Sequence, residues 1–241
     1  MNSPPGSTGN EQNARPSTWA RRLHGALMPD YNTKATAYWW TVVLLGLCAL
    51  VASLLELAAK PPQVWLEVAG GMAIAMLAGF FPVRIPSSKN SFAAGEIFIF
   101  LLLLIHGPGA ATLAAAGEGA IGSWRTSKRW TSRIVSPAMS ALAMYGAAAV
   151  LQAVVGGPDP SAGVLIAASM LVSAGYFVIN TLLVTAVPRL KRNERIQWAD
   201  LFGVFGWVGI AYAGSAAVAS LLYLVFRQSG TGVLKIGRAH V

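Results

Sequence analysis

Two glutamates lie inside apolar segments on either side of one tight turn. Glu96 precedes and Glu118 follows the Gly-Pro-Gly turn at 107–109, at similar spacings. If the two segments form antiparallel helices, the carboxylates lie at a similar depth, within reach of each other or of Lys89 and Arg125. Two close carboxylates cannot both ionise cheaply, so the pair can share one proton or bind a cation. The alternative is that each carboxylate forms a salt bridge that fixes the hairpin.

Two further polar residues accompany this pair. His106 stands beside the turn, where it can respond to pH or simply cap the end of a helix. Asn180 lies within a later apolar segment, where its amide needs a partner on another helix or on a ligand. Glu56 and Glu67 also interrupt apolar segments, but they lie near the segment ends, where water can solvate them. Because polar groups at bilayer depth are costly, the candidate sensing or proton site comprises Glu96, Glu118, His106 and Asn180.

The chain contains no sequence motif of a soluble catalytic site. It has no P-loop, no HExxH and no cluster of Cys and His at metal-ligand spacing. Its single cysteine, Cys48, lies in an apolar run, which excludes a disulfide framework. The glycine-rich run at 117–122 resembles part of a dinucleotide-binding loop, but it lies in an apolar helix without a preceding strand and indicates close helix packing. No catalytic residue, metal ligand or cofactor is therefore predicted.

The elements that must position these side chains are membrane helices. Of the 241 residues, 55% are hydrophobic and only 11% are charged, and the mean hydropathy is +0.55. A soluble domain usually has roughly 25% charged residues, and one of this size cannot hide so much apolar surface. We therefore expect an all-α polytopic membrane bundle with seven apolar segments. These lie near 37–59, 64–83, the two halves of a hairpin at 92–124, 134–155, 164–187 and 201–226.

Prolines and segment lengths suggest where these helices begin and end. Pro137 is expected in the first turn of its helix, and Pro188 is expected to end the sixth segment. Each half of the hairpin is shorter than the roughly 20 apolar residues that a span normally needs. The halves are therefore either short tilted spans or a re-entrant pair that other helices shield. In both cases the two ends of the hairpin emerge on the same side of the membrane.

Most of the 18 Lys and Arg residues fall on one side of the membrane if the N-terminus is cytoplasmic. Two short loops are especially basic, and membrane proteins concentrate Lys and Arg in their cytoplasmic loops. The formal net charge of +9 is therefore a topology signal, and the lipid bilayer rather than nucleic acid is the expected partner. The topology-determining cations are Arg125, Lys128, Arg129, Arg133, Arg189, Lys191, Arg192 and Arg195.

The chain is expected to have three parts. Residues 1–36 are rich in polar residues and proline and are predicted to form a disordered cytoplasmic tail. Residues 37–234 are expected to form a multi-spanning membrane domain. Residues 235–241, KIGRAHV, look like a translated sequencing adapter, and we expect them to be non-native. Seven spans that begin inside leave residue 227 outside, so we expect that an eighth span and a cytoplasmic output domain are missing.

Two runs of the chain point to a family. They are residues 80–138, FFPVRIPSSKNSFAAGEIFIFLLLLIHGPGAATLAAAGEGAIGSWRTSKRWTSRIVSPA, and residues 176–184, YFVINTLLV. The first resembles the N-terminal membrane sensor of bacterial cyclic-di-GMP signalling proteins, which precedes a GGDEF diguanylate cyclase domain and sometimes an EAL phosphodiesterase domain. The second is similar to a segment of related modules ahead of HD-GYP domains. No GGDEF, EAL or HD-GYP motif occurs here, so no catalytic residue can be transferred from the family.

The resemblance covers residues 38–234 and implies a signal-input domain in the bacterial inner membrane. The full-length protein would be a diguanylate cyclase, or a histidine kinase of similar layout, that forms a homodimer through its cytoplasmic output domain. The alternative is a small transporter or a substrate-capturing membrane subunit, in which the four candidate polar residues line a pathway. Such transporters are commonly built from inverted repeats, and no inverted repeat is visible among the seven segments, which favours the sensor.

Overall fold

The computed structural model describes residues 28, 31–80, 83–84, 91–92, 95–154, 161–194 and 198–239. The chain divides into two compact units, Met1–Asp30 and Tyr31–Val241. Most of the predicted tail at 1–36 lies outside the described residues, as does Arg195. The last four residues of that tail belong to the first described helix. The segment at 235–241, which we expect to be non-native, overlaps the end of the last helix.

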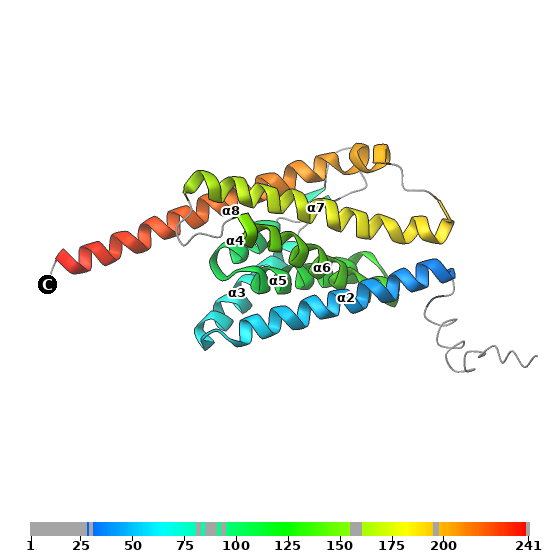
Figure 1. Cartoon of the computed structure of the whole chain (residues 1–241), viewed down its shortest axis with the longest axis horizontal. Coiled ribbons are helices and arrows are strands. Elements are labelled where there is room, and N and C mark those ends of the chain that lie inside the picture. The colour runs from blue at the N-terminus through cyan, green and yellow to red at the C-terminus, as the bar shows by residue number, and fades with distance from the viewer. Residues whose placement is uncertain are drawn as a thin grey trace, which may run out of the picture. The chain divides into compact units, whose positions relative to one another are not determined.

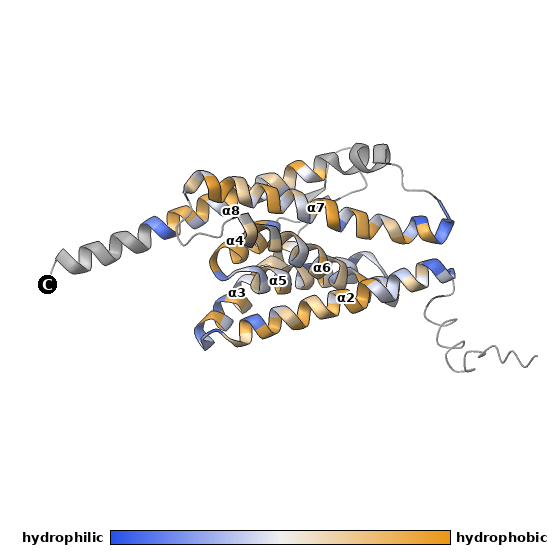
Figure 2. Cartoon of the chain, viewed as in Figure 1, coloured by the Kyte–Doolittle hydropathy of each residue, from blue (hydrophilic) through white to orange (hydrophobic). Residues whose placement is uncertain are grey.

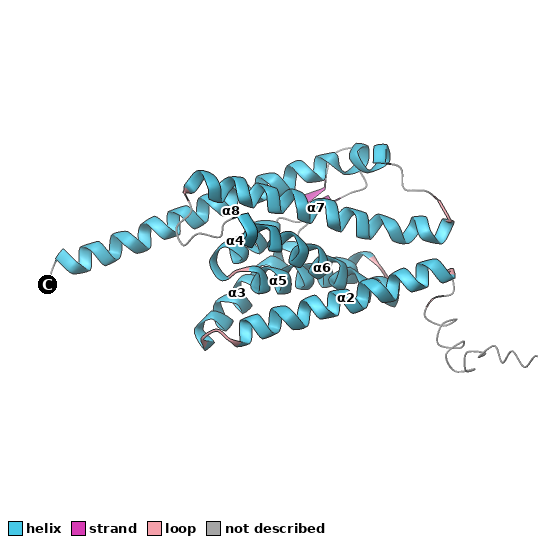
Figure 3. Ribbon diagram, viewed as in Figure 1, coloured by secondary structure: helices cyan, strands magenta, loops and turns pink. Residues whose placement is uncertain are grey.

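Within the described residues the second unit contains seven helices and two very short strands. The helices are α2 (Thr33–Ala58), α3 (Pro62–Gly79), α4 (Glu96–His106), α5 (Pro108–Thr126), α6 (Trp130–Val154), α7 (Ala162–Arg192) and α8 (Trp198–Ala239) (Figure 1). The strands β1 (Val83–Arg84) and β2 (Ser91–Phe92) follow α3 and precede α4 in the chain, and they form one antiparallel pair. Strands are magenta in Figure 3. Each predicted apolar segment corresponds to one helix, and the predicted helical class is confirmed.

Three of the described helices are long and apolar enough to cross a membrane: α2, α7 and the part Val208–Gln228 of α8. They indicate a membrane protein, but length and composition do not support the predicted seven membrane-crossing segments. The hairpin shows why. Its first helix, α4, begins at Glu96 rather than near Phe92 and has 11 residues, which makes it about 16 Å long. The hydrocarbon core of a bilayer is about 30 Å thick.

The helix α5 lies inside the bundle and packs against α2, α3, α4 and α6 (Figure 1). Its buried residues are small, including Ala110, Ala111, Ala114 and Ala115, so the neighbouring helices can approach it closely. α8 packs against α4 and α7, and α6 packs against α2 and α7. Most of the exposed large apolar side chains lie on α2, α7 and α8. The ribbons of α2 and α7 and the coloured part of α8 contain many orange residues in Figure 2. Such an apolar outer surface is typical of contact with lipid.

The two basic loops lie at the same end of the bundle. The Trp39 indole donates a hydrogen bond to the carbonyl of Thr131 (3.0 Å), which joins the start of α2 to the start of α6. The Asn32 amide donates a hydrogen bond to the carbonyl of Leu190 (2.6 Å), which joins the start of α2 to the end of α7. Lys60 follows α2 at the opposite end. We define the basic end by the cations Lys34, Arg125, Arg133, Lys191 and Arg192.

Two prolines that are predicted at helix edges lie inside helices. α6 begins one turn earlier than expected, so Pro137 is within it, and α7 continues past Pro188. α2 packs against these last turns of α7, where the Tyr38 hydroxyl donates a hydrogen bond to the carbonyl of Leu183 (2.9 Å). α7 ends instead at Arg192, and the next residue, Asn193, has a φ of 58°, the left-handed conformation that often terminates helices. Contacts with α2 therefore offset the backbone hydrogen bond that Pro188 cannot donate.

Candidate ligand-binding cavity

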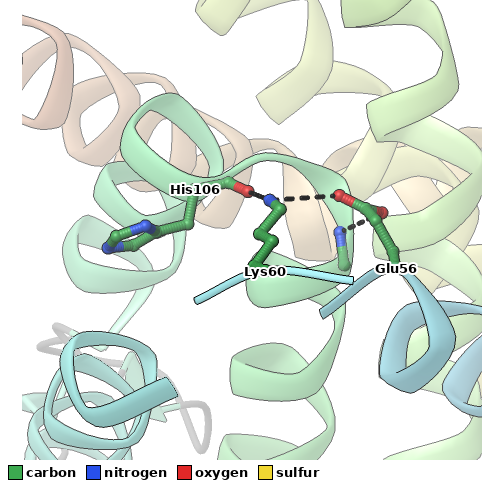
Figure 4. A network of polar contacts seen from close by, with 4 residues as sticks. Glu56, Lys60 and His106 are labelled. Carbon is green, nitrogen blue, oxygen red and sulfur yellow. Dashed lines mark hydrogen bonds and ion pairs between the residues drawn. The ribbon is translucent and has the colours of Figure 1, made fainter. Parts of the chain in front are cut away.

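The turn between α4 and α5 is fixed by a polar network from α2 and the residues after it (Figure 4). Gly107 has a φ of 91°, which residues with a side chain rarely adopt. The carboxylate of Glu56 accepts a hydrogen bond from the backbone N–H of Gly109 (3.0 Å). The Lys60 ammonium forms an ion pair with Glu56 (3.5 Å) and donates a hydrogen bond to the carbonyl of His106. This network lies at the end of the bundle opposite the basic end.

A cavity of about 220 Å³ lies in the half of the bundle nearer the basic end, between six helices. Each of α3, α4, α5, α6, α7 and α8 contributes at least one lining residue. Glycines of α3 and α5 and one valine of α8 form the apolar part of the wall. The polar lining residues are Glu96, Glu118, Ser140, Tyr176, Asn180 and Tyr212.

Glu96 is the first residue of α4 and is only 5% exposed. A carboxylate at a helix N-terminus is electrostatically favourable, because the unpaired backbone N–H groups of the first turn carry partial positive charge. The Tyr212 hydroxyl, on α8, donates a hydrogen bond to this carboxylate. The second oxygen of Glu96, Oε2, is buried without a hydrogen-bond partner. A buried acceptor without a donor is costly, so this oxygen favours a ligand that donates.

Glu118 faces the same cavity from α5. Its Oε1 is also buried without a hydrogen-bond partner, and it packs against Gly95 so tightly that a β-carbon there would overlap it. Among the described residues, neither Glu118 nor Glu96 forms an ion pair with a Lys or Arg. Arg125, one expected partner, instead donates a hydrogen bond to the last carbonyl of α3 (2.8 Å). Lys89, the other expected partner, lies outside the described residues.

Two tyrosines that no sequence motif marks complete the cavity. The rings of Tyr176 on α7 and Tyr212 on α8 are both buried, and their centroids lie 5.4 Å apart. Tyr176 also forms a hydrogen bond with Ser140 of α6. Asn180 lies one turn after Tyr176, and its Oδ1 is buried without a hydrogen-bond partner. Tyr176 and Asn180 are four residues apart, so they lie on the same helix face. This spacing in the sequence could have indicated that Tyr176 lies beside Asn180.

The structure does not bring His106 to this cavity. His106 is the last residue of α4 and Glu96 is the first, so about 15 Å of helix separates them. The Nε2 of His106 lies 3.2 Å from a carboxylate oxygen of Glu67, which is largely exposed. Burial lowers the pKa of His106 below its ordinary value, whereas the nearby Glu67 raises it and Lys60 lowers it further. His106 therefore belongs to the α4–α5 turn and not to the cavity.

Three of the four predicted site residues thus line one cavity, and each has a buried acceptor oxygen without a hydrogen-bond partner. These oxygens are Glu96 Oε2, Glu118 Oε1 and Asn180 Oδ1. Within the described part of the chain, no group of three or more His, Cys, Asp and Glu side chains is placed to hold a metal ion. The arrangement therefore suits a ligand that donates hydrogen bonds. A comparison with known proteins finds no matching family model, no matching curated protein and no matching solved structure.

Proposed function

We propose that the chain is the membrane-embedded signal-input domain of a bacterial cyclic-di-GMP signalling protein of the diguanylate cyclase type. The cavity binds a chemical cue, and α8 transmits the binding event to an output domain. The observation that supports this proposal is the hydrogen bond from Tyr212 to Glu96. Because Tyr212 belongs to α8 and Glu96 to α4, a ligand that binds the free oxygen of Glu96 shares the carboxylate with Tyr212 and changes the strength of a contact that positions α8. A ligand can shift the position of a helix only through such a differential contact.

The proposed topology has a cytoplasmic N-terminus in the bacterial inner membrane. The gathering of Lys and Arg at the basic end supports it, because cytoplasmic loops are enriched in these residues. α3 and α6 run between the same two ends as α2 and α7, so all four cross the membrane on this proposal. α4 and α5 enter from the cytoplasmic side and return to it, and the short α4 is shielded by its contacts with α3, α5 and α8. A further crossing after α8 returns the chain to the cytoplasm.

The DNA that follows codon 234 in the source genome tests the proposed architecture. We expect the reading frame to continue through an eighth span into a GGDEF-type output domain, which forms a homodimer in the cytoplasm. A stop codon soon after α8 would contradict this proposal. That outcome would favour a small transporter or a substrate-capturing membrane subunit.

The output of the full-length protein tests the sensing role of the cavity. Glu96→Gln and Glu118→Gln are compared with Glu67→Gln, which removes the same charge from a largely exposed residue at the opposite end. We expect cellular cyclic-di-GMP to change by about fivefold or more in the two cavity variants, which is a typical allosteric coupling. The Glu67→Gln protein should match the wild type. Equal cyclic-di-GMP levels in all four strains, at equal protein levels, would contradict a sensing role.

A further inference from the structure

We infer that the cavity binds a small primary ammonium compound, whose –NH3+ group lies between Glu96, Glu118 and Asn180. This inference rests on the proposed function, since it names the chemical class of the cue. It is tested by binding alone, so it can fail while the signalling role stands. Four properties of the cavity support it: its unpaired acceptors, its charge, its aromatic wall and its volume.

The unpaired polar atoms of the cavity are all acceptors. They are Glu96 Oε2, Glu118 Oε1 and Asn180 Oδ1. Glu96 is 5% exposed, so bulk water outside the bundle does not satisfy its second oxygen. A primary ammonium group has three N–H donors and no acceptor, which matches three acceptors in number and in kind. An anion or a ligand rich in carbonyl groups would leave all three oxygens without donors.

The two acidic groups of the cavity favour a cation as ligand. Two carboxylates line it, and no described Lys or Arg forms an ion pair with either of them. A positive group between the two carboxylates offsets their mutual repulsion. A calcium ion is a poorer match than an ammonium group, because it prefers about six to eight oxygen ligands. The cavity therefore suits a cation that binds through directed hydrogen bonds.

The remaining wall of the cavity suits a short organic group. The rings of Tyr176 and Tyr212 and the side chain of Val208 line it. Aromatic rings attract ammonium groups and also contact apolar carbon atoms favourably. The volume of about 220 Å³ has room for several water molecules. A short alkylammonium ion fits this space.

The inference is tested with the full 241-residue chain in detergent micelles and with n-propylammonium chloride as the probe. A ligand that binds only the folded protein raises the Tm as its concentration rises. Tetramethylammonium chloride carries the same charge without an N–H donor, and 1-propanol has a similar size without the charge. We expect a saturable rise in Tm with n-propylammonium and little or no rise with the two other compounds. Sodium chloride at equal concentration gives the ionic-strength baseline.

Substitutions then locate the binding site. Glu96→Gln and Glu118→Gln should each weaken n-propylammonium binding by roughly tenfold to a hundredfold, because each removes a charged acceptor. Asn180→Leu removes the neutral acceptor and should weaken binding as well, which gives a test if a glutamine variant does not fold. Glu67→Gln is the matched control and should bind as the wild type does.

Three outcomes would overturn the inference. They are an equal rise in Tm with tetramethylammonium, unchanged affinity in both glutamine variants of the cavity, or no saturable rise with n-propylammonium in the wild-type protein. None of these outcomes decides the proposed function, which depends on the cyclic-di-GMP output of the full-length variants without added ligand.

Discussion

Glu118 packs directly against Gly95, and its Oε1 fills the space that a β-carbon on residue 95 would need. The carbonyl oxygen of Ala75 also borders this space and lies 2.8 Å from the position that the β-carbon would take. Gly95 immediately precedes α4, and Glu118 lies on α5. The missing side chain at residue 95 therefore lets the two helices approach until Glu96 and Glu118 line one cavity.

Gly95→Ala is expected to displace the Glu118 carboxylate and to lower the free energy of unfolding by about 1–3 kcal/mol, the usual cost of overpacking. The displaced carboxylate should also bind n-propylammonium more weakly. Gly70→Ala is the control, because a β-carbon on residue 70 meets no atom within 4 Å and alanine favours a helix over glycine. Chemical unfolding of both variants in detergent micelles measures the difference. Equal stability of the two variants would contradict the tight contact at Gly95.

Glu56 caps the N-terminus of α5 from a different helix. It accepts a hydrogen bond from Gly109, the second residue of α5, and forms an ion pair with Lys60. Glu56→Ala removes both contacts and should lower the free energy of unfolding by about 0.5–2 kcal/mol, the range measured for helix caps. Glu56→Gln retains an acceptor for the Gly109 N–H and should cost less. A larger loss in Glu56→Gln than in Glu56→Ala, measured by chemical unfolding, would contradict the capping role.

The sequence predicts the positions of the helices well, because glycine, proline and charged residues separate the apolar segments. The sequence does not predict which of these helices are long enough to cross a membrane. The apolar run after Phe92 continues into a helix that begins only at Glu96, since Ser91 and Phe92 pair with β1. The sequence pattern also predicts that a helix ends at Pro188. In the structure, contacts with α2 stabilise the turns around this proline, and the helix continues. These contacts join residues more than a hundred positions apart, so local sequence patterns cannot reveal them.

The candidate site is predicted in part for a similar reason. Glu96 and Glu118 lie at comparable spacings from the turn, so an antiparallel hairpin brings both to one depth. His106 lies at the turn itself and is separated from them by the length of α4. Tyr176 and Tyr212 are overlooked because buried aromatic residues usually pack in a core. Only the tertiary structure shows that the Tyr212 hydroxyl meets Glu96 across two helices.

His106 is expected to make the stability of the folded chain depend on pH. Its side chain is 9% exposed, and burial lowers its pKa below the unfolded value of about 6.5. Near and below this pH the unfolded chain therefore binds more protons than the folded chain, so stability falls as the pH falls. We expect the Tm in detergent micelles to decrease between about pH 7.5 and pH 5, on either side of the unfolded value.

Two variants separate this contribution of His106 from other titrations. His106→Gln cannot gain the proton and should show a smaller decrease in Tm over the same pH range. Glu67→Gln should show a larger decrease, because the Glu67 carboxylate raises the pKa of His106 and so reduces the difference between the two states. An identical pH dependence of the Tm in the wild type and in His106→Gln would contradict this role.

Tyr212→Phe tests whether the contact between α8 and α4 transmits ligand binding. The substitution keeps the ring, whose centroid lies 5.4 Å from that of Tyr176 and 5.8 Å from that of Phe177. It removes the hydroxyl that donates to Glu96, and the buried carboxylate then lacks this donor. We expect the free energy of unfolding to fall by about 1–3 kcal/mol.

In the full-length protein, Tyr212→Phe should separate binding from output. Glu96, Glu118 and Asn180 remain in place, so n-propylammonium should still raise the Tm. The same compound should no longer change cyclic-di-GMP output, because α8 no longer donates a hydrogen bond to the carboxylate that the ligand binds. Tyr223→Phe is the control on the same helix, away from the cavity lining, and should keep both responses. If Tyr212→Phe loses both binding and output, Tyr212 positions the ligand itself. If the ligand still changes the output of Tyr212→Phe, α8 responds through other contacts.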